Sequence, residues 1–202
     1  VNGETYIVEG TLLPKVAETC SWENIKEVQS LQGDEVGALE YRHPFIDKTA
    51  KLFAGDSFVD NSTGTGFVHV APGHGMDDYH LGCQHGLPIY CPVDDNGRFI
   101  HTDDLPESEQ MPADLLGKAI LEKRGKSEAN EAVIALLQEK DSLVHQESYT
   151  HSYPHCWRSK TPVIFRGMDQ WFIKIDHNNL RQQALEAVNE VNWVPAWGQN
   201  RI

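Results

Sequence analysis

One segment constrains the fold more than any other: residues 64–86, with the sequence GTGFVHVAPGHGMDDYHLGCQHG. The strand formers of residues 67–70 are followed by Ala71-Pro72-Gly73, which ends a strand because proline has no N–H for a sheet and glycine permits unusual backbone angles. A helix is expected from Met76 to Gly86, where glycine is a favourable C-terminal cap. The chain therefore passes from strand through loop to helix, and histidines and aspartates gather at the junction.

Short β-type segments bounded by turn formers dominate the first hundred residues. They lie at residues 6–8, 25–31, 38–41, 51–54 and 89–93, and the turn Asp94-Asp95-Asn96-Gly97 predicts a hairpin from 89–93 to 98–101. Helices are expected at 12–20, 113–124, 128–140 and 178–188, and further strands at 143–149, 161–166 and 170–175. Many short strands with segregated helices predict an α/β fold of the α+β kind, with a β-barrel-like core of short strands and peripheral helices.

Composition narrows the class of protein. With 40% hydrophobic and 23% charged residues and no apolar run long enough for a bilayer, a globular cytoplasmic protein without a membrane partner is expected. The four cysteines form no C-x-x-C pair, which argues against a zinc ribbon and a disulfide framework. The net charge of −13 argues against strong autonomous nucleic-acid binding unless the few cations gather. The candidate groupings are Lys118, Lys123, Arg124 and Lys126, and Arg158, Lys160 and Arg166.

The glycines and aspartates of residues 64–86 each allow two interpretations. Gly64-Thr65-Gly66 lacks the lysine and spacing of a phosphate loop, and marks either a close approach of backbone or ligand or a simple β-bulge. Asp77 and Asp78 fit as favourable charges at a helix N-terminus, or as an anchor for a cationic group such as an α-ammonium. Local sequence leaves both pairs of alternatives open.

Histidines raise the question of metal or nucleophilic chemistry. A metal hydrolase site on His69, His74 and Asp78 is disfavoured because the histidine spacing is not that of an H-E-x-x-H helix. A nucleophilic pair of His155 and Cys156 is also disfavoured, because neighbouring side chains diverge in an extended segment. A structural hinge with aromatic packing is expected there instead.

Three separated motifs together resemble the editing domain (connective peptide 1) inserted in isoleucyl-tRNA synthetases of class I. They are GTGFVHVAPGHGMDDYHLGCQHGL, HSYPHCWRSKTPVIFR with QWFI, and WVPAWGQNRI, in the family's order and with similar spacing. Valyl enzymes carry lysine where this chain has His69, and leucyl enzymes share mainly the aspartate that matches Asp78, so the isoleucyl family is preferred.

The resemblance covers essentially the whole chain. It implies a single editing domain fragment at 1–202, with a helical insertion at 102–150 and a strand–helix return at 151–202 toward a catalytic core that the fragment lacks.

The resemblance implies a proofreading hydrolase that removes valine from the isoleucine tRNA, or cleaves valyl-adenylate, within an enzyme that ligates isoleucine to its tRNA with ATP. One methylene is worth only about 1–3 kcal/mol in an apolar pocket, a figure for which the isoleucyl enzymes are themselves the established example, so a second, smaller pocket is needed. The implied partners are the tRNA 3′ end carrying valine and the rest of the synthetase, with no cofactor and no metal. The alternatives are a non-catalytic insertion that guides the tRNA 3′ end, and an editing domain of the related valyl or leucyl enzymes.

The resemblance also assigns the site residues. His69 matches the family's pocket histidine, which should limit the pocket's size and hydrogen-bond near the terminal ribose or the attacking water. Asp78 matches the shared aspartate and should anchor the substrate α-ammonium. These two are the expected catalytic residues, and both are expected to bind substrate. Four neighbours are expected to shape or support the same site: Thr65, Gly66, His74 and Asp77.

Departures from the family pattern limit the expected activity. The family's threonine-rich segment, which lines the same pocket, is expected upstream of Val1, so the chain reads as a piece of a longer protein. Ser159 stands where some members carry the second cysteine of a C-x-x-C, which weakens a zinc site further. The H-I-G-H and K-M-S-K-S signatures are missing from the sequence, so aminoacylation by this fragment is not expected.

Overall fold

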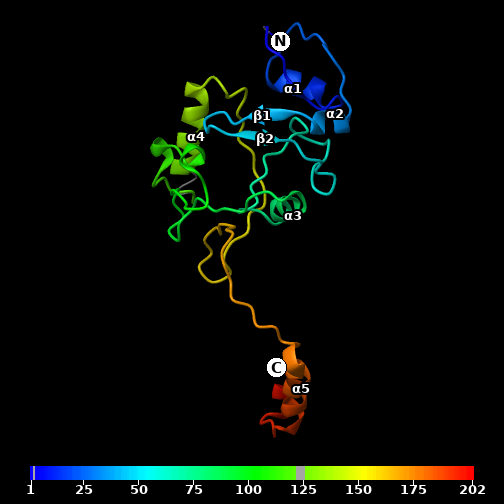
Figure 1. The fold of residues 1–202 in the computed structure, drawn as a ribbon, viewed down its shortest axis with the longest axis vertical. Coiled ribbons are helices and arrows are strands. Elements are labelled where there is room, and N and C mark those ends of the chain that lie inside the picture. The colour runs from blue at the N-terminus through cyan, green and yellow to red at the C-terminus, as the bar shows by residue number, and fades with distance from the viewer. Residues whose placement is uncertain (2, 122–125) are drawn as a thin grey trace. The chain divides into compact units, whose positions relative to one another are not determined.

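The computed structural model describes residues 1, 3–121 and 126–202 (Figure 1). Contacts between residues divide the chain into two units, Val1–Gly167 and Met168–Ile202. The domain boundaries implied by the resemblance, 102–150 and 151–202 within 1–202, stay predictions.

The first unit contains most of the regular structure. Its elements are α1 (Leu13–Thr19), α2 (Gly33–Gly37), β1 (Glu40–Arg42), β2 (Thr49–Lys51), α3 (Met76–His85), the 3-10 helices η1 (Glu107–Glu109) and η2 (Ala113–Leu115), and α4 (Glu128–Glu139). β1 and β2 pair antiparallel, with Tyr41 opposite Ala50 (Figure 1). Within the described part of the chain this pair is the only sheet. The β-barrel-like core with peripheral helices therefore stays a prediction.

The helices predicted at 12–20, 76–86 and 128–140 are confirmed by α1, α3 and α4. α3 ends as the sequence indicates, because Gly86 takes a left-handed φ of 63° and its N–H bonds to the carbonyl of Gly82. α4 begins at Ser127, whose hydroxyl oxygen accepts a hydrogen bond from the N–H of Asn130 at 3.2 Å.

The helix predicted at 113–124 is wrong over the residues described. η2 stops at Leu115 because Gly117 adopts a left-handed φ of 73°. The chain then pairs with the hairpin segment: the N–H of Gly117 donates to the carbonyl of Phe99, and that of Phe99 donates to the carbonyl of Lys118. The end of the predicted helix, from Glu122 to Arg124, lies outside the described residues.

The predicted hairpin of residues 89–101 is confirmed in its turn. Val93 bridges to Phe99, and the N–H of Gly97 donates to the carbonyl of Asp94 at 3.0 Å. The positive φ of 69° falls on Gly97 rather than on Asn96, which is the arrangement of a type I turn followed by a left-handed glycine.

Other strand predictions are wrong or displaced. Regular strands do not form at 6–8, 25–31, 67–70, 143–149, 161–166 and 170–175. The two strands found among the described residues, at 40–42 and 49–51, are shifted from the predicted 38–41 and 51–54. β-propensity describes how a side chain fits a half-buried sheet face, so it does not supply the partner strand that the backbone needs.

A small hydrophobic core lies in the first unit. Its buried side chains are Leu12, Val16, Leu81, Val93, Leu115, Ala119 and Ala129. Ala129 joins α4 to the hairpin region, since its N–H donates to the carbonyl of Ala119 at 3.0 Å.

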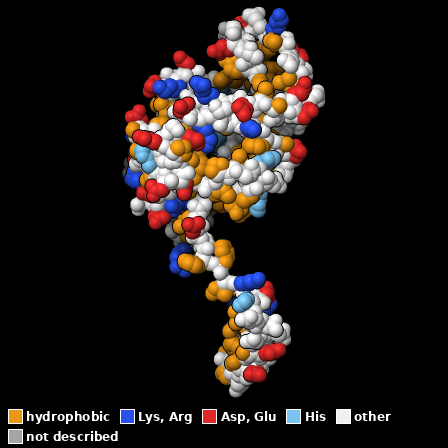
Figure 2. All heavy atoms as spheres, in the orientation of Figure 1, with side chains coloured by type: hydrophobic (Ala, Val, Ile, Leu, Met, Phe, Trp, Pro, Cys, Tyr) orange, Lys and Arg blue, Asp and Glu red, His pale blue; other side chains and the backbone are white. Residues whose placement is uncertain are grey.

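The second unit is helical. It contains η3 (His177–Asn179), α5 (Leu180–Glu190) and η4 (Ala196–Arg201), and α5 confirms the helix predicted at 178–188. The indole N–H of Trp193 donates to the carbonyl of Val188, and the amide of Gln199 donates to Asn189, so the C-terminal segment folds back beside α5 (Figure 1). Apolar side chains of this unit, Trp171 among them, are exposed (Figure 2). Over the residues described, no helix combines the length and apolar character needed to cross a bilayer.

Candidate functional site

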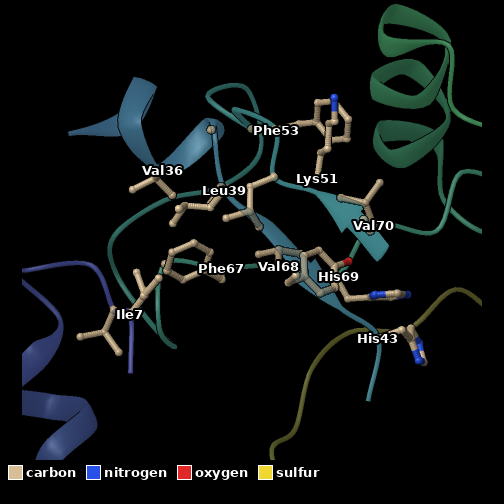
Figure 3. Close-up of a pocket in the computed structure, with 18 of the residues that line it drawn as sticks. Ile7, Val36, Leu39, His43, Lys51, Phe53, Phe67, Val68, His69 and Val70 are labelled. Atoms are coloured by element: carbon tan, nitrogen blue, oxygen red, sulfur yellow. The ribbon is translucent and has the colours of Figure 1, made fainter. Parts of the chain in front are cut away.

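A cavity of about 1750 Å³ lies in the first unit. Apolar side chains form much of the wall drawn in Figure 3: Ile7, Val36, Leu39, Phe53, Phe67, Val68 and Val70. His43, Lys51 and His69 bring polar groups to the same wall. A large, mostly apolar cavity with a few polar groups is the usual architecture of a small-molecule site.

His69 stands on this wall with its imidazole exposed. It follows Phe67 and Val68, and its ring lies on the same side of the view as that of His43 (Figure 3). Within residues 1, 3–121 and 126–202 the ring makes no hydrogen bond to protein, so both nitrogens are available to water or a ligand. His69 lies on the cavity wall, and its expected roles as size limit and catalytic residue stay predictions.

His43 is a cavity residue that the sequence analysis missed. Its Nδ1 accepts hydrogen bonds from the backbone N–H groups of Phe45 at 3.3 Å and Ile46 at 3.1 Å. Burial lowers the pKa of His43, and the neighbouring His69 and Lys48 lower it further. The sequence holds a partial signal, because Pro44 favours an extended backbone at His43, the residue that precedes it.

Lys48 is the cation beside this histidine. Its ammonium lies 3.0 Å from the carboxylate of Glu109 and 5.5 Å from the ring centre of Tyr90. Burial opposes the charge, but the hydrogen bond with Glu109 and the contact with Tyr90 outweigh it and raise the pKa of Lys48. Lys48 therefore keeps its positive charge, and the carboxylate of Glu109 is its counter-ion.

Thr65 and Gly66 tie the glycine-rich loop to the start of α1. The carbonyl of Thr65 accepts the N–H of Glu9 at 2.9 Å, and a Cβ on Gly66 would lie 2.5 Å from Cβ of Glu9. The carboxylate of Glu9 in turn accepts the N–H groups of Thr11 and Leu12. Of the two open interpretations, close backbone approach is confirmed at Gly66, where φ is 84°.

His74 is held by the backbone of a distant segment. Its Nδ1 lies 2.9 Å from the carbonyl oxygen of Phe165, to which it donates. The adjacent Gly73 accepts the N–H of Gly167 at 2.6 Å, and a Cβ on Gly73 would overlap the carbonyl oxygen of Tyr90. Glycine is needed at this crossing for close approach rather than for an unusual backbone angle.

Asp77 and Asp78 lie in the first turn of α3. The carboxylate of Asp78 bends back over the helix start, because a Cβ on Gly75 would lie 2.7 Å from its Oδ2. Asp77 is exposed. Both carboxylates complement the positive end of the helix dipole, as the first of the two sequence interpretations states.

The structure brings some of the expected site residues together. Gly66, His69 and His74 line the cavity, whereas Thr65, Asp77 and Asp78 are not among its lining residues. Among the described residues, no group of three or more His, Cys, Asp and Glu side chains is arranged to hold a metal ion. The metal hydrolase built on His69, His74 and Asp78 therefore finds no geometric support.

The HSYPHCWR segment forms a tight turn. The N–H of Cys156 donates to the carbonyl of Thr161, and the Nδ1 of His155 donates to the carbonyl of Tyr153, so the imidazole serves the backbone rather than the thiol. The hydroxyl of Ser159, followed by the backbone N–H groups of Ser159 and Arg158, lowers the pKa of Cys156. The rings of Tyr153 and His155 meet edge-on, and the structural hinge expected in this segment stays a prediction.

The candidate basic groupings are partly neutralised. Lys126 lies 3.5 Å from Glu131, and Arg166 lies 2.8 Å from Asp95. Lys123 and Arg124 lie outside the described residues. Figure 2 shows acidic side chains spread over the visible face of the first unit, with Lys and Arg in small groups. This charge distribution agrees with the net charge of −13.

Comparisons with known proteins extend over nearly the whole chain. The family model described as tRNA synthetases class I (I, L, M and V) matches residues 13–202. The isoleucine–tRNA ligase of Persephonella marina is 44% identical over 98% of this chain, and that of Thermotoga petrophila is 43% identical over 100% of it. The Bacillus cereus isoleucine–tRNA ligase is 42% identical over 100% of the chain.

In each case the match covers 20% of the relative, so the chain spans about a fifth of the length of these ligases. With 190 consecutive positions matched to the family, from 13 to 202, the chain belongs to the class I tRNA synthetases (I, L, M and V).

Proposed function

We propose that this chain is the proofreading domain of an isoleucine–tRNA ligase, and that it hydrolyses valine esters of the isoleucine tRNA, valyl-adenylate, or both. The relatives matched along the chain are isoleucine–tRNA ligases, which supports an isoleucine tRNA as the carrier of the ester. The ATP-dependent ligation, the tRNA partner and the cytoplasmic setting belong to that longer enzyme and are part of the same proposal.

The observation that carries the proposal is the imidazole of His69 on the wall of the apolar cavity, which makes no hydrogen bond to the residues that the structure describes. An aminoacyl ester is already an activated acyl group, so its hydrolysis needs mainly a positioned water and a group that accepts a proton. His69 offers both ring nitrogens for this purpose. Val68 and Val70, which flank it in the chain, give the apolar surface that a branched aliphatic side chain requires.

Discrimination against isoleucine requires a small space beside His69. The synthetic pocket of an isoleucine enzyme cannot strongly reject valine, because the smaller side chain fits wherever the larger one does. A hydrolytic pocket can reject isoleucine by steric exclusion, since one added methylene in a filled space forces side chains off their preferred positions. We assign this size limit to the ring of His69.

Asp78 is proposed as the anchor of the substrate α-ammonium. A carboxylate and an ammonium form a charge-assisted hydrogen bond, which holds the amino end of the substrate while the ester is attacked. The side chain is half-buried at the start of α3, and its Oδ2 is turned toward Gly75. The ammonium role therefore requires the carboxylate to serve the substrate as well as the helix N-terminus.

The position of Asp78 also favours a second candidate function, in which the domain guides the tRNA 3′ end without catalysis. Asp78 is outside the cavity lining, and its carboxylate already complements the helix dipole. In that case Asp78 would affect the fold of α3 and the placement of the tRNA, while the ester bond would break only at the spontaneous rate.

Deacylation of charged tRNA distinguishes the two functions. Isoleucine tRNA carrying valine or isoleucine is incubated with the 202-residue chain, and with a chimera in which the chain replaces the matching segment of the Thermotoga maritima isoleucine–tRNA ligase, 43% identical to it. The proofreading proposal predicts release of valine faster than of isoleucine, and a loss of about 10²-fold or more in His69→Ala and in Asp78→Ala. His80→Ala, an exposed α3 variant, is the matched control. Spontaneous rates in both the chain and the chimera would refute proofreading and leave the guiding function, which predicts weaker tRNA binding in Asp78→Ala.

A further inference from the structure

We propose that His43 is a second functional histidine of this cavity: an imidazole that the backbone holds in one tautomer, whose Nε2–H donates a hydrogen bond to an oxygen of the bound aminoacyl ester. This inference rests on the proposed hydrolytic function and adds to it a residue outside the set expected from the sequence.

The backbone fixes the tautomer of His43. Two N–H groups, of Phe45 and Ile46, point their hydrogens at Nδ1. A nitrogen that accepts two hydrogen bonds carries a lone pair and no proton. The proton of the neutral ring is therefore on Nε2. Protonating Nδ1 would set its hydrogen against both backbone donors and break the turn that they close.

Charges around the ring reinforce the neutral state. Two titratable groups act on His43: His69, on the same cavity wall, and Lys48. Each disfavours a positive charge on the ring of His43. Lys48 stays charged through its 3.0 Å contact with Glu109. The ring of His43 also meets that of Phe45 edge-on at 4.6 Å between centres, which further limits its rotation.

The contrast with His69 gives the two imidazoles different tasks. His69 has no protein hydrogen bond within the described part of the chain, so its ring nitrogens are open to water or a ligand. His43 cannot exchange a proton at Nδ1 and has a single donor to offer. A fixed neutral imidazole is suited to polarise a carbonyl or to stabilise the negative oxygen that forms when water attacks it.

The position of His43 beside His69 makes an ester oxygen the expected acceptor of its Nε2–H. His43 and His69 lie on one side of the view in Figure 3, and the apolar side chains of Ile7 and Val36 lie on the other. A water activated by His69 would attack an ester carbon held beside it, and the oxygen of that carbonyl needs a donor within reach. A donor that acts on the developing charge lowers the barrier of the chemical step more than it strengthens substrate binding.

The first test is spectroscopic and independent of activity. A long-range ¹H–¹⁵N spectrum of the full chain, labelled at histidine, distinguishes protonated from unprotonated ring nitrogens. We expect His43 to show a bare Nδ1 and a protonated Nε2, and to keep this state when the pH is lowered to about 6, half a unit below the ordinary histidine pKa. A proton on Nδ1 at neutral pH would overturn the inference.

The second test uses His43→Asn. An asparagine side chain before a proline keeps an oxygen that can accept the two backbone N–H groups, but it has no donor at the position of Nε2. In the chimera we expect kcat for valine release to fall about 10²-fold with KM changed far less, and the melting temperature to stay close to that of the parent. His43→Gln places an amide N–H farther out and is expected to restore part of the rate.

Outcomes separate the inference from the proposed function. An inactive parent chimera refutes the proofreading proposal, and the role of His43 falls with it. An active parent with an unimpaired His43→Asn variant refutes only the role of His43. Should His43→Asn fail to fold, the spectroscopic result and the rate of His43→Gln decide, because a glutamine variant without activity above that of His43→Ala would refute a donor role.

Discussion

The Nδ1 of His74 lies 2.9 Å from the carbonyl oxygen of Phe165, 91 residues further along the chain. Next to it, the carbonyl of Gly73 accepts the N–H of Gly167. Two hydrogen bonds thus join the loop before α3 to the segment that follows the HSYPHCWR turn. Both His74 and His69 line the cavity, but His74 is tied to the backbone of a distant segment.

Replacing His74 with alanine should therefore lower stability. The variant loses one hydrogen bond and leaves a carbonyl without its partner, so the free energy of unfolding should fall by about 1 kcal/mol. Urea unfolding monitored by tryptophan fluorescence measures the change. His80→Ala removes an exposed imidazole from α3 and should leave the midpoint unchanged. Equal midpoints for both variants would contradict a structural role for His74.

Gly73→Ala should lower the free energy of unfolding more than the addition of one methyl group suggests. The added methyl group would overlap the carbonyl oxygen of Tyr90, and backbone cannot rotate away as a side chain can. Overpacking of this kind costs about 1–3 kcal/mol. Gly10→Ala is the matched control, because no atom lies within 4 Å of a Cβ there and its φ is not left-handed. A Gly73→Ala variant as stable as Gly10→Ala would show that the close crossing with Tyr90 is not present in solution.

The sequence predicts helices here better than strands, and the reason is physical. The helix of residues 128–139 is determined by local signals, the Ser127 cap and the apolar periodicity behind it. A strand needs a partner that can lie far away in the chain, so the β-type residues at 67–70 gave no information about their neighbours. The same limit applies to the cavity, since the approach of His43 to His69 depends on long-range packing that no local pattern encodes.

Ser127→Ala tests the one buried polar side chain recorded in the described residues. Ser127 is 3% exposed, accepts the N–H of Asn130 at 3.2 Å and donates to the carbonyl of Ala119 at 3.3 Å. Loss of an N-cap costs about 1 kcal/mol. Chemical denaturation should show this loss, together with less helix by circular dichroism. Ser142→Ala removes an exposed hydroxyl that donates to the carbonyl of Lys140, and it should change neither quantity.

Stability should also depend on pH through His43. Its pKa is lowered in the folded chain from the ordinary value of 6.5, so the unfolded chain binds more protons than the folded one when the pH falls below that value. The contribution of the neutral ring is therefore fully present above about pH 6.5 and is lost as the pH falls through the folded pKa. The free energy of unfolding, measured between about pH 7.5 and 5, should fall with decreasing pH.

His43→Asn isolates this contribution, because every other titratable group is common to both proteins. The variant keeps an acceptor for the N–H groups of Phe45 and Ile46 but cannot bind a proton, so its stability should fall less than that of the parent over the same pH range. The difference between the two curves should be smallest above about pH 7, where both side chains are uncharged in the folded and unfolded states. Parallel curves down to pH 5 would mean that His43 titrates alike in both states, and the backbone turn around Nδ1 would then not constrain it.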